Sequence, residues 1–168
     1  HGEPAPDFTL VDTEGREVRL AELQGKPVIV NFWGSWCPPC LQELPGLSRF
    51  ARSHPEVVLL GITVDSGEGE VLAAEKERLG IPFPVLAADN IVQQSYGVRV
   101  LPTTFLVDEQ GIVRRHHVGI VSPEKLDLQF LDFVQDRPTV TRAGLGVGLR
   151  GGEQEQGEQE LAGLVYRR

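Results

Sequence analysis

The chain of 168 residues contains no methionine and only two cysteines. It also lacks an uninterrupted run of about 20 apolar residues, the length that a helix needs to cross a bilayer. Because methionine is absent, we expect the mature chain to have lost a signal peptide or an N-terminal membrane anchor. Because both cysteines lie in one motif, no stray thiol is left for an oxidising compartment to pair, which favours a location outside the cytoplasm.

The chain has fewer basic than acidic residues, 16 Lys and Arg against 24 Asp and Glu, and its formal net charge is −8. This balance disfavours nucleic acid and anionic membrane surfaces as partners. The hydrophobic fraction of 40% is enough for one core. After Pro138 the composition shifts to glycine and then to a Glu/Gln tract, so we expect one domain over residues 1–137 and a tail over residues 138–168.

The two cysteines, Cys37 and Cys40, stand in the motif WGSWCPPC at residues 33–40. An apolar, β-branched stretch precedes the motif, and a segment with helical spacing follows it. The motif is therefore expected where a buried strand gives way to a helix. The free N–H groups and positive dipole end of a helix N-terminus favour a thiolate, which is the reactive form of cysteine.

Other uses of a CxxC motif fit less well. A structural zinc site needs a second pair of ligands, but the chain has no further cysteine and its four histidines have no suitable spacing. A c-type haem site needs histidine directly after the second cysteine, where this chain has Leu41. A purely structural disulfide would close a very short ring and constrain the unfolded chain little. These comparisons with zinc, haem and structural-disulfide sites favour a redox role for the CxxC motif. We expect no metal and no cofactor.

Four segments make the chain similar to the thioredoxin superfamily, and in particular to its extracytoplasmic TlpA/ResA/CcmG-like branch. The resemblance covers about residues 3–136. The segments are VNFWGSWCPPC at residues 30–40, Pro45 five residues after Cys40, the stretch YGVRVLPTTFLVD at residues 96–108, and the opening PAPDFTL at residues 4–10.

The resemblance implies an α/β thioredoxin-like sandwich, in which helices flank a central mixed β-sheet. An N-terminal β-hairpin and a helical insertion at residues 66–88, before the strand that follows the cis-proline, complete the expected fold. From apolar patterns and turn residues we expect strands at 8–10, 17–20, 28–32, 57–64, 83–86, 103–107 and 112–118, and helices at 38–53, 68–79, 90–95 and 122–135.

We expect Cys37 to be the exposed nucleophile and Cys40, one turn deeper, to resolve the mixed disulfide. Pro38 and Pro39 lack N–H groups, so few backbone donors face the Cys37 sulfur. A less stabilised thiolate makes the couple more reducing, which favours a disulfide reductase over a strong oxidant.

Substrate contacts are expected around the motif. Trp36 is interpreted as an aromatic wall for the partner or as packing over the helix start, whereas Trp33 is expected in the core. The resemblance implies that the Leu101–Pro102 bond is cis and faces the cysteines. There the segment offers an extended backbone edge against which a substrate strand can pair. We assign Trp36, Pro38, Leu101 and Pro102 to substrate binding.

Asn31 stands where thioredoxins carry a buried aspartate that moves protons for the deeper cysteine, and an amide cannot titrate. Glu43 lies three residues after Cys40, hence on the same helix face, and ResA-like proteins carry a glutamate there. We assign Glu43 to catalysis, against the alternative of a solvated surface glutamate. His116 and His117 alternate on a strand and cannot both face one site.

The motif predicts a thiol-disulfide oxidoreductase that acts on disulfide-containing proteins, and the resemblance implies a role such as cytochrome c maturation. A membrane-embedded electron donor would recharge it. One alternative is a copper chaperone or metal-site assembly factor, although such proteins use CxxxC with a distant histidine. Another is a peroxiredoxin-like peroxidase, although Val30 and Gly34 occupy the Pro and Thr positions of the PxxxTxxC motif. The tail is expected to be dispensable for the dithiol chemistry; a docking arm is the alternative.

Overall fold

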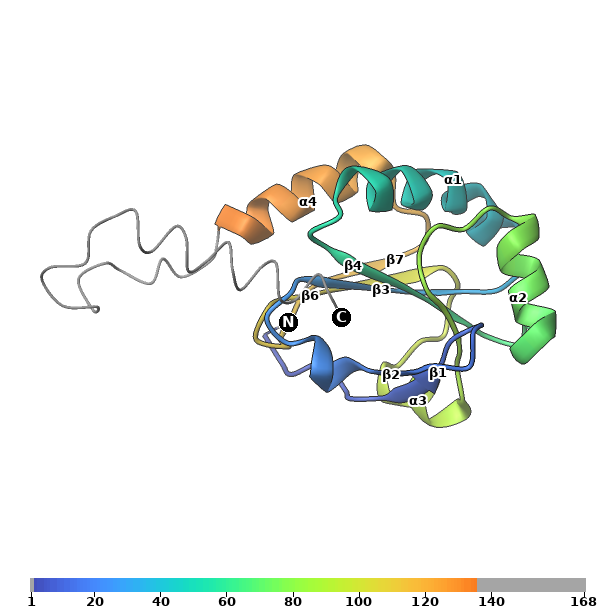
Figure 1. The fold of residues 1–168 in the computed structure, drawn as a ribbon. Coiled ribbons are helices and arrows are strands. Elements are labelled where there is room, and N and C mark those ends of the chain that lie inside the picture. The colour runs from blue at the N-terminus through green and yellow to red at the C-terminus, as the bar shows by residue number, and fades with distance from the viewer. Residues whose placement is uncertain (1, 136–168) are drawn as a thin grey trace, which may run out of the picture.

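The computed structural model describes residues 2–135 of the chain. The predictions for the tail at residues 138–168 lie outside these described residues. Within them, a central sheet lies between two layers of helices and loops (Figure 1).

Five strands form the central sheet in the order β5-β4-β3-β6-β7. β3, β4 and β5 run parallel to one another, β6 pairs antiparallel with β3, and β7 pairs antiparallel with β6. The mixed sheet predicted from the resemblance is confirmed. The strands are β3 (Val28–Trp33), β4 (Val58–Thr63), β5 (Val85–Ala87), β6 (Thr103–Val107) and β7 (Val113–Val118).

The helices cover both faces of the sheet. α1 (Pro38–Ser53) and α4 (Pro123–Gln135) lie together over one face. α3 (Asn90–Ser95) and a separate hairpin lie over the other face, and α2 (Gly69–Arg78) lies at the side (Figure 1). The hairpin consists of β1 (Thr9–Val11) and β2 (Glu17–Arg19), followed by the 3-10 helix η1 (Leu20–Leu23).

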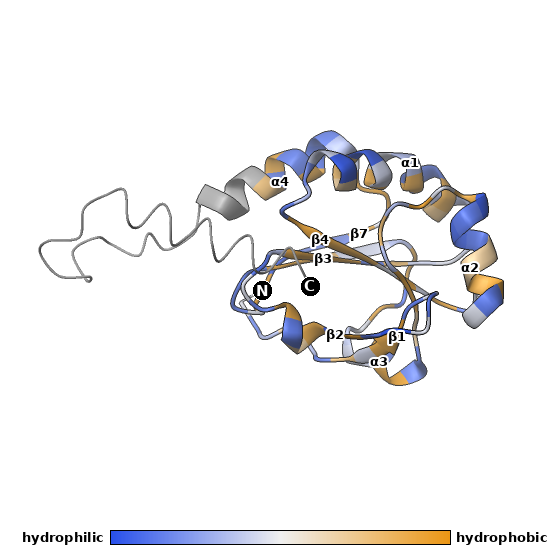
Figure 2. Cartoon of the chain, viewed as in Figure 1, coloured by the Kyte–Doolittle hydropathy of each residue, from blue (hydrophilic) through white to orange (hydrophobic). Residues whose placement is uncertain are grey.

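β3 is buried along its whole length, and its side chains alternate between two hydrophobic cores. Val28, Val30 and Phe32 pack into the core under the hairpin and α3. Ile29 and Trp33 pack into the core under α1 and α4, whose hydrophobic sides face the sheet (Figure 2). The same alternation places Asn31 on the α1 side, where it is fully buried.

The predicted bounds are close to those observed. The helix predicted at residues 38–53 is α1 with the same ends, and it continues through Pro45. Most strand ends differ from the predictions by one or two residues, because the last residues of a strand are set by pairing with a neighbour. The insertion predicted at residues 66–88 contains α2 and β5, and α3 follows it.

His54 joins the end of α1 to α4. Its Nδ1 lies 3.0 Å from Glu56 Oε1, and its Nε2 lies 2.8 Å from Asp127 Oδ1. The ring also packs between Phe50 and Phe130, with centroid distances of 4.4 and 5.0 Å. Burial alone would lower the pKa of His54, but the hydrogen bonds and charges of Glu56 and Asp127 outweigh burial and raise this pKa.

The raised pKa predicts that the fold is more stable in mild acid. The contribution of protonated His54 is fully present below the pKa of the unfolded chain, about 6.5, and is lost as the pH rises through the folded-state pKa. Urea unfolding at several pH values should show a loss of up to about 1 kcal/mol, because the acidic partners are about half exposed. His54→Gln should remove this loss, and Asp127→Asn should reduce it. An unchanged pH profile in His54→Gln would contradict the assignment.

Candidate active site

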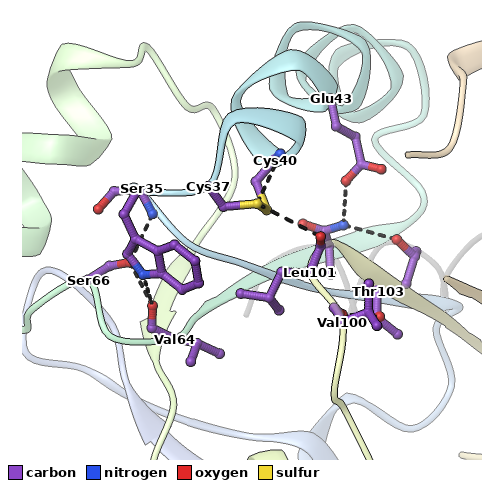
Figure 3. Close-up of a disulfide and its surroundings, with 12 residues drawn as sticks. Ser35, Cys37, Cys40, Glu43, Val64, Ser66, Val100, Leu101 and Thr103 are labelled. Atoms are coloured by element: carbon purple, nitrogen blue, oxygen red, sulfur yellow. Dashed lines mark hydrogen bonds between the residues drawn. A yellow bond between two sulfur atoms is a disulfide. The ribbon is translucent and has the colours of Figure 1, made fainter. Parts of the chain in front are cut away.

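The two cysteines form a disulfide at the start of α1 (Figure 3). Cys37 is the N-cap residue, with extended backbone angles φ −101° and ψ 108°, and Pro38 and Pro39 occupy the first helical positions. Proline is well suited to these positions, because their N–H groups have no partner within a helix. The Cys40 N–H donates to the Cys37 sulfur at 3.4 Å. Neither proline can add a second backbone donor, as the sequence predicts.

Both cysteines are buried: the exposed fraction is 5% for Cys37 and 1% for Cys40. The prediction of an exposed Cys37 is therefore wrong for the disulfide form. One cause is the loop before β6, whose Leu101 carbonyl oxygen lies 3.8 Å from the Cys37 sulfur. A disulfide sulfur has no hydrogen, so this is a packing contact, whereas a Cys37 thiol at this place could donate to the oxygen.

The Leu101–Pro102 peptide bond is cis, which confirms that prediction. Leu101 is half-buried beside the disulfide, and Pro102 is buried. The Pro102 carbonyl accepts a hydrogen bond from Gly119 N–H at 2.8 Å, and the Thr103 hydroxyl donates to the Val100 carbonyl at 2.6 Å. The first bond holds the loop against the segment that follows β7, and the second fixes the loop's own shape.

Trp36 is exposed over 57% of its surface, yet its indole N–H donates to the Val64 carbonyl at 3.0 Å. A Cβ atom on Gly34 would lie 2.9 Å from the indole ring, so glycine allows this close approach. Ser35 N–H donates to the Ser66 hydroxyl at 2.9 Å, and that hydroxyl donates to the same Val64 carbonyl. Trp36 is thus a fixed, exposed aromatic surface beside the disulfide.

The sequence does not mark Ser66 as a partner of Ser35, because the two residues are 31 positions apart and Ser66 lies in no motif. Trp33 is 1% exposed, as predicted for a core residue. Pro38 is exposed at the start of α1, next to the disulfide.

Glu43 is only 3% exposed, so the alternative of a solvated surface glutamate is wrong. Its Oε1 accepts a hydrogen bond from Asn31 Nδ2 at 2.8 Å, and its Oε2 accepts one from the Val121 backbone N–H at 2.8 Å. In Figure 3 the side chain reaches from α1 towards the sheet. Val121 is 78 residues from Glu43 in the sequence, and nothing in the sequence marked it as a partner.

Burial raises the pKa of Glu43, because a carboxylate loses solvation away from water. The hydrogen bonds from Val121 and Asn31 lower this pKa, but only in part, and it remains above that of a free glutamate. A carboxyl group of this kind takes up a proton more readily near neutral pH than a surface glutamate does.

Asn31 connects Glu43 to the sheet. It is fully buried, and its Nδ2 also donates to the Thr104 hydroxyl on β6 at 2.9 Å. Its Oδ1 has no hydrogen-bond partner. Thr104 pairs in register with His117 on β7, and His117 Nε2 lies 3.2 Å from the Ile120 carbonyl. His116 instead stacks on Phe105 at 4.6 Å, so the two histidines lie on opposite faces, as predicted.

Across residues 2–135 no group of three or more His, Cys, Asp or Glu side chains is arranged to hold a metal ion. In the same part of the chain, no helix combines the length and the apolar character that crossing a membrane requires.

The sequence matches the AhpC/TSA family over residues 1–116. It is 41% identical to the thiol-disulfide oxidoreductase ResA of Geobacillus thermodenitrificans (strain NG80-2) over 128 residues, which cover 74% of this chain and 73% of that protein.

Solved structures show the same fold. The thiol:disulfide interchange protein of the thioredoxin family from Chlorobium tepidum TLS superposes with a TM-score of 0.72 at 27% identity, covering 80% of this chain and 97% of that one. A secreted disulfide oxidoreductase of Mycobacterium tuberculosis, homologous to E. coli DsbE, superposes with a TM-score of 0.66 at 26% identity, covering 74% of this chain and 95% of that one.

Proposed function

Because the chain belongs to the thioredoxin-like AhpC/TSA family and is a ResA-like thiol-disulfide oxidoreductase, we propose that it reduces disulfides of protein substrates outside the cytoplasm. The observation that carries the proposal is the Cys37–Cys40 disulfide beside the cis-Pro102 loop, with the carboxyl of Glu43 buried on the same helix.

The reaction transfers two electrons from the reduced pair to the substrate. The Cys37 thiolate attacks one sulfur of the substrate disulfide, so that a mixed disulfide forms and the other substrate sulfur leaves as a thiolate. Cys40 then loses its proton to Glu43 and attacks the Cys37 sulfur. This step forms the Cys37–Cys40 disulfide and releases the second substrate thiolate, which takes a proton from water. Cys37, Cys40 and Glu43 are the catalytic residues of the proposal.

The surroundings of Cys37 favour a reductant over a strong oxidant. Pro38 and Pro39 offer no N–H, and the Cys40 N–H is the backbone donor that reaches the Cys37 sulfur. A weakly stabilised thiolate leaves the reduced form relatively unstable, and such a couple gives its electrons away more readily.

Substrate proteins would bind across the surface formed by Trp36, Pro38, Leu101 and Pro102. Trp36 and Pro38 are exposed beside the disulfide. The Leu101–Pro102 segment would offer backbone for pairing with an extended substrate strand. We propose apocytochrome c or another metal-site precursor as substrate, a membrane-embedded thiol-disulfide transporter as electron donor, and tethering through an N-terminal anchor as the means of localisation.

A peroxidase is the alternative function. The chain matches the AhpC/TSA family, and its opening segment PAPDFTL is shared with peroxiredoxin-like proteins. The PxxxTxxC motif is not present, because Val30 and Gly34 stand at its proline and threonine positions. Both positions are buried, and neither carries a hydroxyl that could contact a peroxide. The geometry favours disulfide exchange.

The order of attack predicts an asymmetric trapping experiment. Cys40→Ser should accumulate a mixed disulfide between Cys37 and a model substrate, because the resolving thiol is missing. Cys37→Ser should accumulate little, since Cys40 is 1% exposed and is the resolving residue. Non-reducing electrophoresis and mass spectrometry of the adducts measure both. Trapping by Cys37→Ser alone would reverse the assignment, and trapping by neither variant would remove the proposed function.

The role of Glu43 predicts a slower resolving step in Glu43→Gln. General-base catalysis contributes about 10²- to 10⁴-fold, so we expect a loss on the order of a hundredfold at neutral pH. In the parent the rate should rise with pH as the carboxylate forms, at a higher pH than for an ordinary glutamate because the pKa is raised. Stopped-flow decay of a preformed mixed disulfide measures this rate. Glu70→Gln, at an exposed position in α2, is the control, and equal rates in all three proteins would exclude Glu43 as the base.

A further inference from the structure

Asn31, Thr104 and Glu43 form a buried polar cluster with one unsatisfied atom. Glu43 Oε1 and Thr104 Oγ1 each accept a hydrogen bond from Asn31 Nδ2, so both hydrogens of the amide nitrogen are used. Asn31 Oδ1 has no partner, although the residue is fully buried. Buried polar atoms without partners are rare in folded proteins, and each one calls for a physical reason.

The observed arrangement suits a carboxylate. A carboxylate only accepts hydrogen bonds, and both Glu43 oxygens receive an N–H, from Asn31 and from Val121. Once Glu43 takes up a proton, it gains an O–H that must donate to an acceptor. The Val121 N–H and the Asn31 NH₂ are donors and cannot receive it.

The unsatisfied Asn31 Oδ1 is an acceptor that can receive this O–H. It belongs to the same planar amide as the nitrogen that contacts Glu43. A half-turn of the amide about the Cβ–Cγ bond exchanges the two atoms and brings Oδ1 to the carboxyl group. The nitrogen then moves to the place that Oδ1 leaves.

Thr104 can follow this turn without moving. A hydroxyl group both accepts and donates, so it accepts from Nδ2 in the present arrangement and would donate to Oδ1 after the turn. A valine in its place would have the same shape but neither capacity. The three side chains therefore have two arrangements, one for the carboxylate and one for the acid. In the second, the O–H of Glu43 gains an acceptor, and the amide nitrogen takes the unpartnered place that Oδ1 holds in the first.

We propose that Asn31 is a positioning residue whose side-chain amide turns over when Glu43 gains or loses a proton, with Thr104 as the pivot. Asn31 thereby holds Glu43 in one place on both sides of the proton transfer from Cys40. The proton passes from the Cys40 thiol to a Glu43 oxygen and stays there as an O–H that donates to Asn31 Oδ1; Asn31 itself is never protonated. The inference rests on the proposed role of Glu43 as the base.

Other titratable groups near the cluster are few. Cys40 precedes Glu43 on α1, and it does not titrate while the disulfide is intact. His117 lies beside Thr104 on β7. α4 packs against α1 through the buried Leu126, whereas its Glu124 and Lys125 are exposed and its Asp127 pairs with His54. β3 and β6 present Asn31 and Thr104, which do not titrate. In the disulfide form, His117 is therefore the titratable group beside the cluster whose effect must be separated from that of Glu43.

An NMR titration of the oxidised protein tests the turn directly. The chain has two asparagines, Asn31 and the exposed Asn90, so the second side-chain amide is an internal reference. We would follow the Asn31 NH₂ signals and the Glu43 Cδ signal from about pH 4 to about pH 9, because burial raises the pKa of Glu43 above that of a free glutamate. As the pH falls, the Asn31 NH₂ protons should lose both hydrogen bonds, shift upfield and exchange faster with water. The midpoint should equal that of Glu43 Cδ.

Two variants assign the cause of the change. In Glu43→Gln the Asn31 signals should no longer depend on pH, and in His117→Gln they should still do so with the parent midpoint. The proposed amide turn is wrong if the Asn31 signals stay constant while Glu43 Cδ titrates. It is also wrong if Glu43 does not titrate between about pH 4 and about pH 9. Because the measurement needs no turnover, it is independent of the trapping and stopped-flow results: Asn31 can fail to turn in an active reductase, and an inactive protein can still show the turn.

Discussion

The buried carboxylate of Glu43 is the contact on which the active site depends. A carboxylate is costly to bury unless donors satisfy it, and here the donors come from two distant parts of the chain. Asn31 belongs to the central strand β3, and Val121 belongs to the segment between β7 and α4. The carboxylate therefore connects the active-site helix α1 to the sheet and to the loop that contacts Pro102. This one group, the proton acceptor of the proposed reaction, thus links the helix that carries the disulfide to the segment that contacts the cis-proline loop.

The sharp transition from β3 to α1 supplies the rest of the geometry. Gly34 lets the Trp36 indole lie against the backbone, and Cys37 ends the turn as the helix N-cap. The two prolines after it favour a helix start while withholding N–H groups from the Cys37 sulfur. The same four-residue motif thus fixes where the helix begins and, in the proposed reductant, would limit how well the thiolate is stabilised.

Much of this could be predicted from the sequence, because the signals are local. The helix at Pro38–Ser53 follows from proline positions and apolar spacing, and the site of Glu43 follows from its place one turn after Cys40. The distant hydrogen-bond partners in the site could not be predicted. Ser66 binds Ser35 through a hydroxyl and Val121 binds Glu43 through a backbone N–H, at separations of 31 and 78 residues, and neither group has a sequence signature. The burial of Cys37 likewise depends on Leu101, which only the folded chain brings near.

The central claim is that this pair of cysteines donates electrons. The reduction potential of the Cys37–Cys40 couple, measured at equilibrium against a glutathione or dithiothreitol series, tests it most directly. The account predicts a potential nearer to that of thioredoxin, about −270 mV, than to that of the oxidant DsbA, about −120 mV. A potential close to −120 mV would show that the Cys37 thiolate is strongly stabilised despite the two prolines. That result would contradict the proposed role as a reductant.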